Sequence, residues 1–234
     1  YLKPVTTESA TASYRGSWGK ARFNGWLFGD YSSNSQVSAI WFDKNSIRYS
    51  IPVNTRKPSY TYSTDFNFFT PLSKDGKLQL SVSGGLAINR SVSYQSKGSL
   101  DGIDLDSFDY TGFMDNFWGD ASGDRFYSGQ SGFQESLTRI LRTDLSIELT
   151  LNLERFSVQL APAVNNSRSR YSLDSRANTN YWETFLNIRP SYTSPHEFEF
   201  QSDFSYVILR GYGSGYDDDY VRWNFSVGKN IKSF

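Results

Sequence analysis

Residues 141–164 read LRTDLSIELTLNLERFSVQLAPAV, two alternating limbs that meet at Glu154-Arg155. In the first limb, Leu or Ile fills every odd position from 141 to 153 except Thr143, and polar residues fill the even positions. In the second limb, Phe156, Val158, Leu160 and Val164 continue the alternation. Successive side chains of a strand point to opposite faces, so each limb predicts a strand with one apolar and one polar face. A two-residue turn would set Leu153 opposite Phe156 on the same face.

The length of these limbs indicates where the hairpin lies. Each limb has roughly ten alternating residues, which is close to the length that a tilted strand needs to cross a bilayer. A typical strand of a soluble protein is only about half as long. The stretch therefore predicts a membrane-spanning β-hairpin.

The composition fits such a hairpin and excludes other classes. The chain of 234 residues is 17% aromatic, yet its mean hydropathy is −0.54. A barrel wall combines both properties, because only alternate residues meet lipid and aromatic rings gather at the two interfaces. The charge is balanced, 24 basic against 24 acidic residues, so no nucleic-acid partner is expected. Cysteine is absent, which argues against a small disulfide-stapled secreted module.

Similar alternation along the whole chain predicts nine strands. The run 36–42 is expected to extend the second strand, and the third strand needs a bulge or kink near residues 52–58, where the phase slips. The second strand carries Trp26 and Phe28 at the parity of Arg22 and Asn24, so its pattern fits either face. The nine predicted strands cover residues 8–18, 22–31, 47–68, 78–89, 141–152, 156–165, 182–192, 198–208 and 221–231.

The connections between these strands alternate in length. Those near residues 19, 73, 154 and 195 are short, whereas the others include long loops at 97–136, 166–179 and 211–219. Outer-membrane barrels have this asymmetry, with short periplasmic turns and longer extracellular loops. We therefore expect residues 1–234 to form one transmembrane antiparallel β-barrel segment, with its long extracellular loop at 97–136. Bacterial barrels of one chain have an even number of strands, so nine implies further strands before residue 1.

Two motifs carry a resemblance to a known family. Residues 1–4 (YLKP), which lead into a strand, resemble the "N-P-x-L-K-P-E" motif before a mid-barrel strand of TonB-dependent outer-membrane transporters, although Val5 stands where that family has Glu. Residues 211–215 (GYGSG) and 223–230 (WNFSVGKN) are similar to the closing hairpin of a transporter-like outer membrane β-barrel family. The order of strands and turns fits the C-terminal part of such a barrel over nearly the whole chain.

The resemblance implies a function and partners. It implies energy-coupled import of a nutrient across the outer membrane of a Gram-negative bacterium, through a barrel of about 22 strands with a plugged lumen. In this family the plug domain and the segment that contacts the TonB system lie N-terminal to the region matched here. This chain would contribute wall, lumen lining and loops, with no catalytic residue and no cofactor. Its expected partners are outer-membrane lipid, the TonB system and a surface lipoprotein that caps the mouth.

Two alternatives from other classes stay open at this point. One is a self-contained eight-stranded barrel that starts at Arg22, has a structural or adhesive role and fills its interior with side chains. Charged residues at the polar parity, among them Arg142, Glu148 and Arg189, could form its internal network. The other is a soluble, glycan-binding β-sandwich, which should have shorter strands.

Residues with catalytic or metal-binding chemistry are few. The sole histidine, His196, lies in a short turn on the expected periplasmic side, away from where an outer-membrane protease or lipase would need it. Without cysteine, few ligands remain for a transition metal. The aspartates between residues 101 and 124 miss the calcium-loop pattern, because Phe108 stands two positions after Asp106, and a solvated loop is favoured. Residues 217–219 (DDD) are likewise expected to be a solvated loop tip.

Aromatic residues in the long loop are the best candidates for ligand contact. Exposed rings among Asp, Asn and Ser can stack on a sugar or an apolar ligand surface, while the polar groups orient it. A loop of this length also needs a core, so part of the set is expected to pack on itself. Trp118 is the strongest candidate, followed by Tyr110, Phe117 and Tyr127.

The candidate at Trp118 can be tested directly. Trp118→Ala should weaken ligand affinity and reduce uptake, because it removes the ring proposed to stack on the ligand. Uptake and equilibrium binding in the variant and the unmodified protein measure the effect. Unchanged values for both quantities would remove Trp118 from the ligand site.

Overall fold

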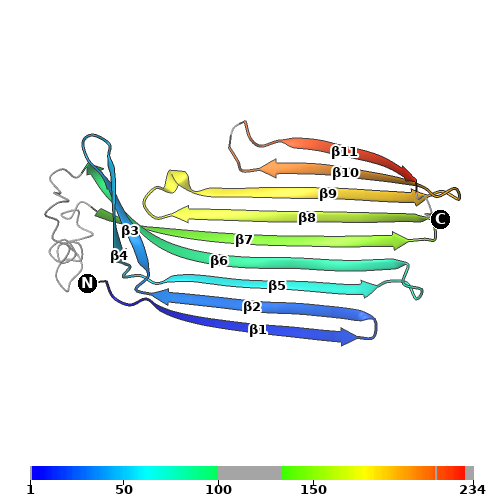
Figure 1. Ribbon diagram of the computed structural model, residues 1–234, viewed down its shortest axis with the longest axis horizontal. Coiled ribbons are helices and arrows are strands. Elements are labelled where there is room, and N and C mark those ends of the chain that lie inside the picture. Colours follow the sequence, from blue (N-terminus) through cyan, green and yellow to red (C-terminus); the bar gives the residue numbers. More distant parts are fainter. Residues whose placement is uncertain (1, 100–132, 214, 230–234) are drawn as a thin grey trace, which may run out of the picture.

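The computed structural model describes residues 2–99, 133–213 and 215–229, and in them the chain forms a single sheet of eleven strands (Figure 1). Nine strands lie side by side in the order β1-β2-β5-β6-β7-β8-β9-β10-β11, each antiparallel to its neighbours. These strands are β1 (Thr6–Trp18), β2 (Ala21–Ser33), β5 (Ser59–Pro71), β6 (Leu78–Ser99), β7 (Phe133–Asn152), β8 (Phe156–Tyr171), β9 (Thr179–Thr193), β10 (Phe198–Arg210) and β11 (Asp219–Lys229). The fold class is therefore all-β, as predicted.

The sheet is open within the described residues. β1 lies at one edge and β11 at the other, and these two strands do not pair with each other. A 3₁₀ turn at Ser175–Ala177 joins β8 to β9. In the described part of the chain, no helix is both long enough and apolar enough to span a membrane.

The connections separate by length between the two ends of the sheet, as the sequence predicted. Short turns join β1 to β2, β5 to β6, β7 to β8 and β9 to β10, all at one end (Figure 1). In the turn between β7 and β8, the backbone N–H of Leu153 donates to the carbonyl of Phe156 at 2.7 Å, so these residues are opposed as expected. The longer connections between β8 and β9 and between β10 and β11 lie at the opposite end.

One register extends along each pair of neighbouring strands on the main path and keeps the apolar side chains on one face. β6 and β7 stay in phase from Leu78↔Leu151 to Ser96↔Phe133. Because parity is preserved from strand to strand, the sheet has an apolar face and a polar face. One row of cross-strand neighbours on the apolar face consists of Thr70, Leu80, Leu149, Leu160, Ile188, Phe204 and Trp223.

The register also assigns the two faces of β2, which the sequence left open. Phe23 is the partner of Phe68, which in turn opposes Val82 on β6. Phe23 and Leu27 therefore belong to the apolar face. Trp26 is the partner of Asp65, so Trp26 and Phe28 lie on the polar face.

Aromatic rings cover the glycines of the apolar face. A Cβ added to Gly84 would lie 2.9 Å from the ring of Phe66 and 2.9 Å from the carbonyl oxygen of Asp144. At Gly25, an added Cβ would lie 3.0 Å from the ring of Phe23. The rings of Phe23 and Phe66 are themselves stacked, with centroids 6.4 Å apart. These glycines let the rings lie flat on the backbone, which supports register in the same way as aromatic rescue in designed sheets.

The prediction for residues 36–68 was wrong in its connectivity. Residues 36–42 do not extend the second strand but form a strand of their own, β3 (Gln36–Phe42), and residues 47–68 form two strands, β4 (Arg48–Asn54) and β5. β3 pairs with β4 as a hairpin and runs parallel to the outer part of β6, where Ala39 opposes Tyr94. The predicted kink at 52–58 is in reality the point where the chain leaves this hairpin and enters β5. Two strands outside the main path thus bring the nine predicted strands to eleven among the described residues.

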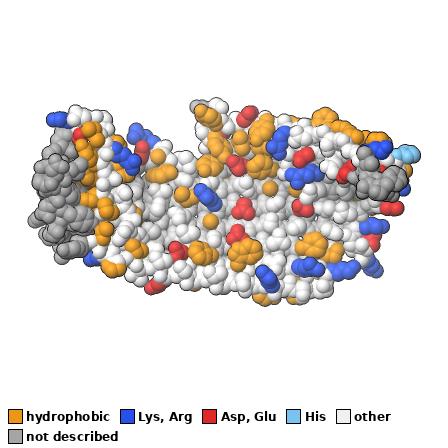
Figure 2. All heavy atoms as spheres, in the orientation of Figure 1, with side chains coloured by type: hydrophobic (Ala, Val, Ile, Leu, Met, Phe, Trp, Pro, Cys, Tyr) orange, Lys and Arg blue, Asp and Glu red, His pale blue; other side chains and the backbone are white. Residues whose placement is uncertain are grey.

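A compact apolar core holds the β3–β4 hairpin at the end of the sheet opposite the short turns, where hydrophobic side chains gather (Figure 2). Trp41, which is 2% exposed, stacks on Tyr49 at 5.5 Å and meets Phe133 edge-on at 6.0 Å. Burial of large rings and aliphatic side chains in one cluster gives the hairpin its stability. The buried members of the cluster are Ala39, Trp41, Ile51, Val53, Val92, Tyr94 and Phe133.

Two predicted loops are shorter than expected. β6 continues to Ser99 and β7 begins at Phe133, so both ends of the predicted loop 97–136 belong to strands. β8 continues to Tyr171, which leaves only residues 172–178 of the predicted loop 166–179 between β8 and β9. Polar sequence misled the prediction here, because Asn166 and Ser169 are buried within the strand despite their polar side chains.

The hairpin core can be tested with neighbouring aromatic residues on opposite faces of β3. Trp41→Ala should lower local stability by about 3–5 kcal/mol, because it leaves a large cavity in the cluster. Phe42→Ala is the matched control, since the Phe42 side chain is 48% exposed. Amide hydrogen exchange across residues 37–53 should accelerate strongly only in the Trp41 variant. Equal acceleration in both variants would contradict the assignment of the core.

Candidate functional site

The predicted ligand-contact residues Trp118, Tyr110, Phe117 and Tyr127 lie outside the described residues. The aspartates between residues 101 and 124 lie there as well. The strands that lead to and from this segment are anchored in the hairpin core, because Ser96 on β6 opposes Phe133 on β7. The proposed ligand contact at Trp118 therefore stays a prediction.

The other residues singled out from the sequence have defined positions. His196 is exposed in the turn between β9 and β10, where Ser194 donates its backbone N–H to the carbonyl of Phe198 at 2.8 Å. Residues 217–219 are not simply a solvated tip. Asp217 accepts the backbone N–H of Tyr212 at 2.7 Å, and hydrogen bonds from the backbone of Gly211 and Tyr212 lower the pKa of its carboxyl. This aspartate fixes the loop between β10 and β11.

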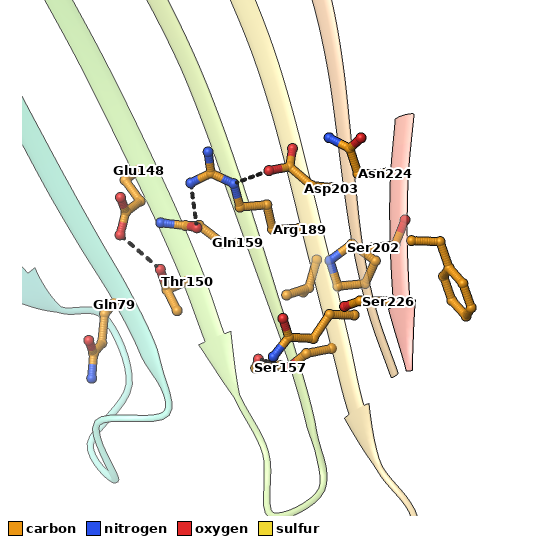
Figure 3. A pocket seen from close by; sticks show the side chains of 15 residues that line it. Gln79, Glu148, Thr150, Ser157, Gln159, Arg189, Ser202, Asp203, Asn224 and Ser226 are labelled. Atoms are coloured by element: carbon orange, nitrogen blue, oxygen red, sulfur yellow. Dashed lines mark hydrogen bonds and ion pairs between the residues drawn. The ribbon is translucent and has the colours of Figure 1, made fainter. Parts of the chain in front are cut away.

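The polar face holds a groove over strands β6 to β11, near the end with the short turns (Figure 3). Its volume is about 510 Å³. The groove exists because alternate residues of six neighbouring strands present small hydroxyl and amide side chains between a few charged ones. Its polar lining consists of Gln79, Glu148, Thr150, Ser157, Gln159, Arg189, Ser191, Gln201, Ser202, Asp203, Asn224 and Ser226.

Arg189 organises the charges of this groove. Its Nε lies 3.2 Å from Oδ2 of Asp203 on β10, and its Nη1 donates to Oε1 of Gln159 on β8 at 3.4 Å (Figure 3). The Arg189 side chain is 48% exposed, so water screens the ion pair and its contribution to stability is small. The guanidinium is held in place by neighbours on both sides while part of it faces the groove. The arrangement is suited to bind polar or charged ligand groups.

A second groove of about 300 Å³ lies further along the polar face, toward the end with the long connections. Arg142, Asp144, Asn165, Tyr181 and Glu183 line it. Asp144 approaches Asp65 over Gly85, because a Cβ at this glycine would lie within 3.0 Å of a carboxylate oxygen of each. In the described part of the chain, however, no group of three or more acidic or histidine side chains is arranged to hold a metal ion.

Tyr212, from the loop after β10, contacts two residues that line this second groove. Its hydroxyl donates to Oε1 of Glu183 at 2.5 Å, and its ring stacks on Tyr181 at 4.7 Å. The hydrogen bond to the Glu183 carboxylate raises the pKa of Tyr212 to about 12. A stacked pair of tyrosines beside carboxylate and amide groups can bind a flat or ring-shaped polar ligand, including a sugar.

Sequence reasoning placed Arg142, Glu148 and Arg189 on the polar face, and both grooves are lined by such residues, but it missed Tyr212. Tyr212 lies in a loop without periodicity and meets Glu183 from 29 positions away, so no local signal linked them. Only its shared parity with Arg22 and Asn24 could have assigned Trp26 to the polar face, and that pattern fitted either face.

Both grooves present side chains that can bind a ligand. The chain's sole histidine lies in the turn between β9 and β10, outside both grooves, and the chain has no cysteine. The grooves offer arginine, carboxylate, amide and hydroxyl groups, which orient ligands and fix their register. In comparisons with known proteins, no family model, no curated protein and no solved structure matches the chain.

The Tyr212–Glu183 contact predicts a late-titrating phenol. The raised pKa of Tyr212 means that this contact stabilises the loop fully below the ordinary tyrosine pKa of about 10, and that the stabilisation is lost as pH rises through about 12. Glu183→Gln should move the pKa of Tyr212 down toward the ordinary value, because the negative partner is gone. Ultraviolet difference titration of phenolate formation measures the shift.

The control for this titration lies in the same loop. Tyr216→Phe removes the hydroxyl of a side chain that is 73% exposed and should leave the late-titrating phenol in place, whereas Tyr212→Phe should remove it. Because the Tyr206 hydroxyl also donates to a carboxylate, that of Asp219 at 3.1 Å, the titrations are carried out in a Tyr206→Phe background. In that background, persistence of the late-titrating phenol in Tyr212→Phe would show that the contact has been assigned to the wrong tyrosine.

Proposed function

We propose that this chain forms part of the wall of a large β-barrel in the outer membrane of a Gram-negative bacterium, and that the barrel imports a nutrient with energy from the TonB system. The apolar face of the sheet would contact lipid, and the polar face would line the lumen. The end with the short turns would face the periplasm, and the end with the β3–β4 hairpin would face outward. The chain would have no catalytic role and need no cofactor.

The exposure of the apolar face is the observation that carries this proposal. Leu145 and Ile147 are each 40% exposed although they lie on β7, the central strand of the main path, and Leu153, directly after β7, is 48% exposed. A soluble sandwich would bury this row against a second sheet. Monomeric soluble proteins rarely expose an apolar patch of more than a few hundred Å². Exposure of a wide apolar sheet face is energetically favourable when the face contacts hydrocarbon instead of water.

The spacing of aromatic residues on this face supports the same conclusion. On β9, Tyr192 lies beside Phe156 and Phe200 near the short turns, and Trp182 lies near the other end of the strand. The ten residue steps between Tyr192 and Trp182 span about 34 Å at about 3.4 Å each, or about 26 Å in height for a strand tilted by about 40°. Outer-membrane barrels have an apolar band about 25 Å tall between aromatic girdles.

The open sheet favours a wide barrel over a small one. Nine neighbouring strands lie in sequence without a pairing between β1 and β11 in the described residues. An eight-stranded barrel that starts at Arg22 would need β2 to pair with β11. Both edges of β2 are occupied, one by β1 and the other by β5. More strands than these are needed to close the wall, in line with a barrel of about 22 strands.

Import by a TonB-coupled mechanism is supported by the resemblance at residues 1–4, 211–215 and 223–230 and by the character of the polar face. A wide lumen lined by grooves with Arg, Asp, Glu and amide side chains provides contacts for a plug or for polar cargo. The further partners would be outer-membrane lipid and a surface lipoprotein over the mouth. The Trp118 experiment is extended by measuring uptake in cells that lack the energy-coupling protein. If import is coupled to TonB, uptake should stop in those cells.

Cysteine labelling tests the orientation of the wall without background, because the chain has no cysteine of its own. In native membranes, Ser146→Cys should react with a membrane-impermeant maleimide once the lumen is accessible. Leu145→Cys and Ile147→Cys should stay unlabelled, because their side chains would lie in hydrocarbon. The labelling should therefore alternate with the period of two of a strand.

The labelling experiment has a clear contrary outcome. Reaction of all three cysteines at similar rates in intact membranes, or recovery of the protein in the aqueous fraction without detergent, would exclude the membrane wall. Denatured protein labelled at all three positions serves as the control for intrinsic cysteine reactivity.

A further inference from the structure

Four arginines gather on the apolar face at its border with the long connections. They are Arg90 on β6, Arg139 on β7, and Arg168 and Arg170 on β8. Each has the parity of the apolar side chains of its own strand. We call these four residues the arginine row.

The strand register makes three of them direct neighbours. Arg90 opposes Arg139, and Arg139 opposes Arg170, within pairings that contain no bulge between these positions and the apolar residues. Neighbouring strands lie about 4.8 Å apart, so the backbones of the three arginines span only about 10 Å. Arg168 lies two residues before Arg170 on β8, closer to the apolar residues, and opposes Leu141.

This concentration of positive charge has no compensating carboxylate in the described part of the chain. Arg90 donates to the carbonyl of Pro58 at 3.0 Å and lies 5.0 Å from the ring of Tyr60, and both partners are neutral. Arg139, Arg168 and Arg170 are exposed and form no ion pair with a described carboxylate. Like charges directly opposite each other in a sheet are destabilising. An anion bound between them would convert this repulsion into attraction.

Carboxylates on neighbouring elements are already paired with other groups. Glu135 on β7 binds Lys57 at 2.5 Å, and Asp174 in the loop after β8 pairs with Arg176 at 3.0 Å. The arginine row therefore stands apart from the internal ion pairs of this end of the sheet, and the anion it favours must come from outside the described chain.

The position of the row specifies the kind of anion. Leu141, Ile88 and Leu86 lie directly beside the arginines on the same face, and Ile88 opposes Leu141. Ile88 and Leu86 are 37% and 38% exposed. A molecule bound here meets guanidinium groups at one end and exposed aliphatic side chains at the other. That combination fits an amphiphile whose anionic headgroup is joined to acyl chains.

We propose that the arginine row binds a phosphate-bearing lipid headgroup of the outer leaflet, with the acyl chains along Leu86, Ile88 and Leu141. This inference rests on the proposed membrane location of the sheet. Guanidinium groups bind phosphate oxygens through paired, charge-assisted hydrogen bonds. A phosphate monoester carries about −1.5 to −2 charges and three acceptor oxygens, which matches several arginines better than a single carboxylate does. Simple snorkelling of arginines to water needs no such alignment across three strands.

The test uses the purified protein in phosphatidylcholine nanodiscs to which lipid A is added, either with its phosphate monoesters or after their enzymatic removal. Native mass spectrometry counts bound lipid A and yields its affinity. The double variant Arg139→Gln/Arg170→Gln should weaken binding of the phosphorylated form by roughly tenfold or more, because two charge-assisted contacts to the phosphates are lost. Removal of the phosphates should weaken binding to the unmodified protein by a similar factor.

Two further variants sharpen the result. Arg15→Gln and Arg222→Gln remove exposed arginines at the polar parity of β1 and β11, and should change affinity by less than about twofold, the size of effect expected of a surface charge away from the site. Arg139→Lys/Arg170→Lys keeps the charge but loses the forked geometry, so its affinity should lie between those of the unmodified protein and the Gln variant.

The contrary outcomes separate this inference from the proposed function. Stable insertion into nanodiscs with equal affinity for phosphorylated and dephosphorylated lipid A, or equal losses in the Arg15 and Arg139/Arg170 variants, would overturn the lipid site alone. Failure of the unmodified protein to insert into any lipid would overturn the membrane wall and the lipid site together.

Discussion

The constraint on which this molecule depends is the uninterrupted hydrogen-bonded register between its long strands. Strand side chains alternate with a period of two, so a slip of one residue in any strand would move all its apolar side chains to the polar face. From Leu78↔Leu151 to Ser96↔Phe133, β6 and β7 show no such slip. The same phase continues through β8, β9 and β10, where Leu160, Ile188 and Phe204 are successive neighbours. Two chemically distinct faces follow from this one property.

The nine strands of the main path could be predicted because alternation is a local signal that needs no knowledge of the partner strand. The β3–β4 hairpin could not, because residues 36–42 and 47–53 alternate like extensions of their neighbours. Only long-range packing distinguishes the two arrangements: Trp41 meets Phe133, 92 positions away in the chain. The faces of β2 needed the same kind of information, since the pairing of Phe23 with Phe68 decides them and composition does not.

The candidate sites likewise divide into features that the local sequence shows and features that depend on long-range pairing. The sequence showed the polar character of this face, and it placed His196 in a short turn. The Tyr212–Glu183 contact and the arginine row were not visible, because each joins residues of separate elements. Arg90, Arg139 and Arg170 look unremarkable in three separate polar-rich segments, and become one surface only when the pairing of β6, β7 and β8 aligns them.

The parallel contact between β3 and β6 separates the β3–β4 hairpin from the main path of the sheet. β6 pairs with β5 as far as Arg90, and from Tyr94 onward with β3. The hairpin is thus attached to the far end of a strand whose lower part is held independently by β5 and β7. Substitutions in β3 and β4 can therefore reshape this end of the sheet without disturbing the alignment of the other strands. Such a division lets selection diversify the hairpin over generations while the main sheet stays constant.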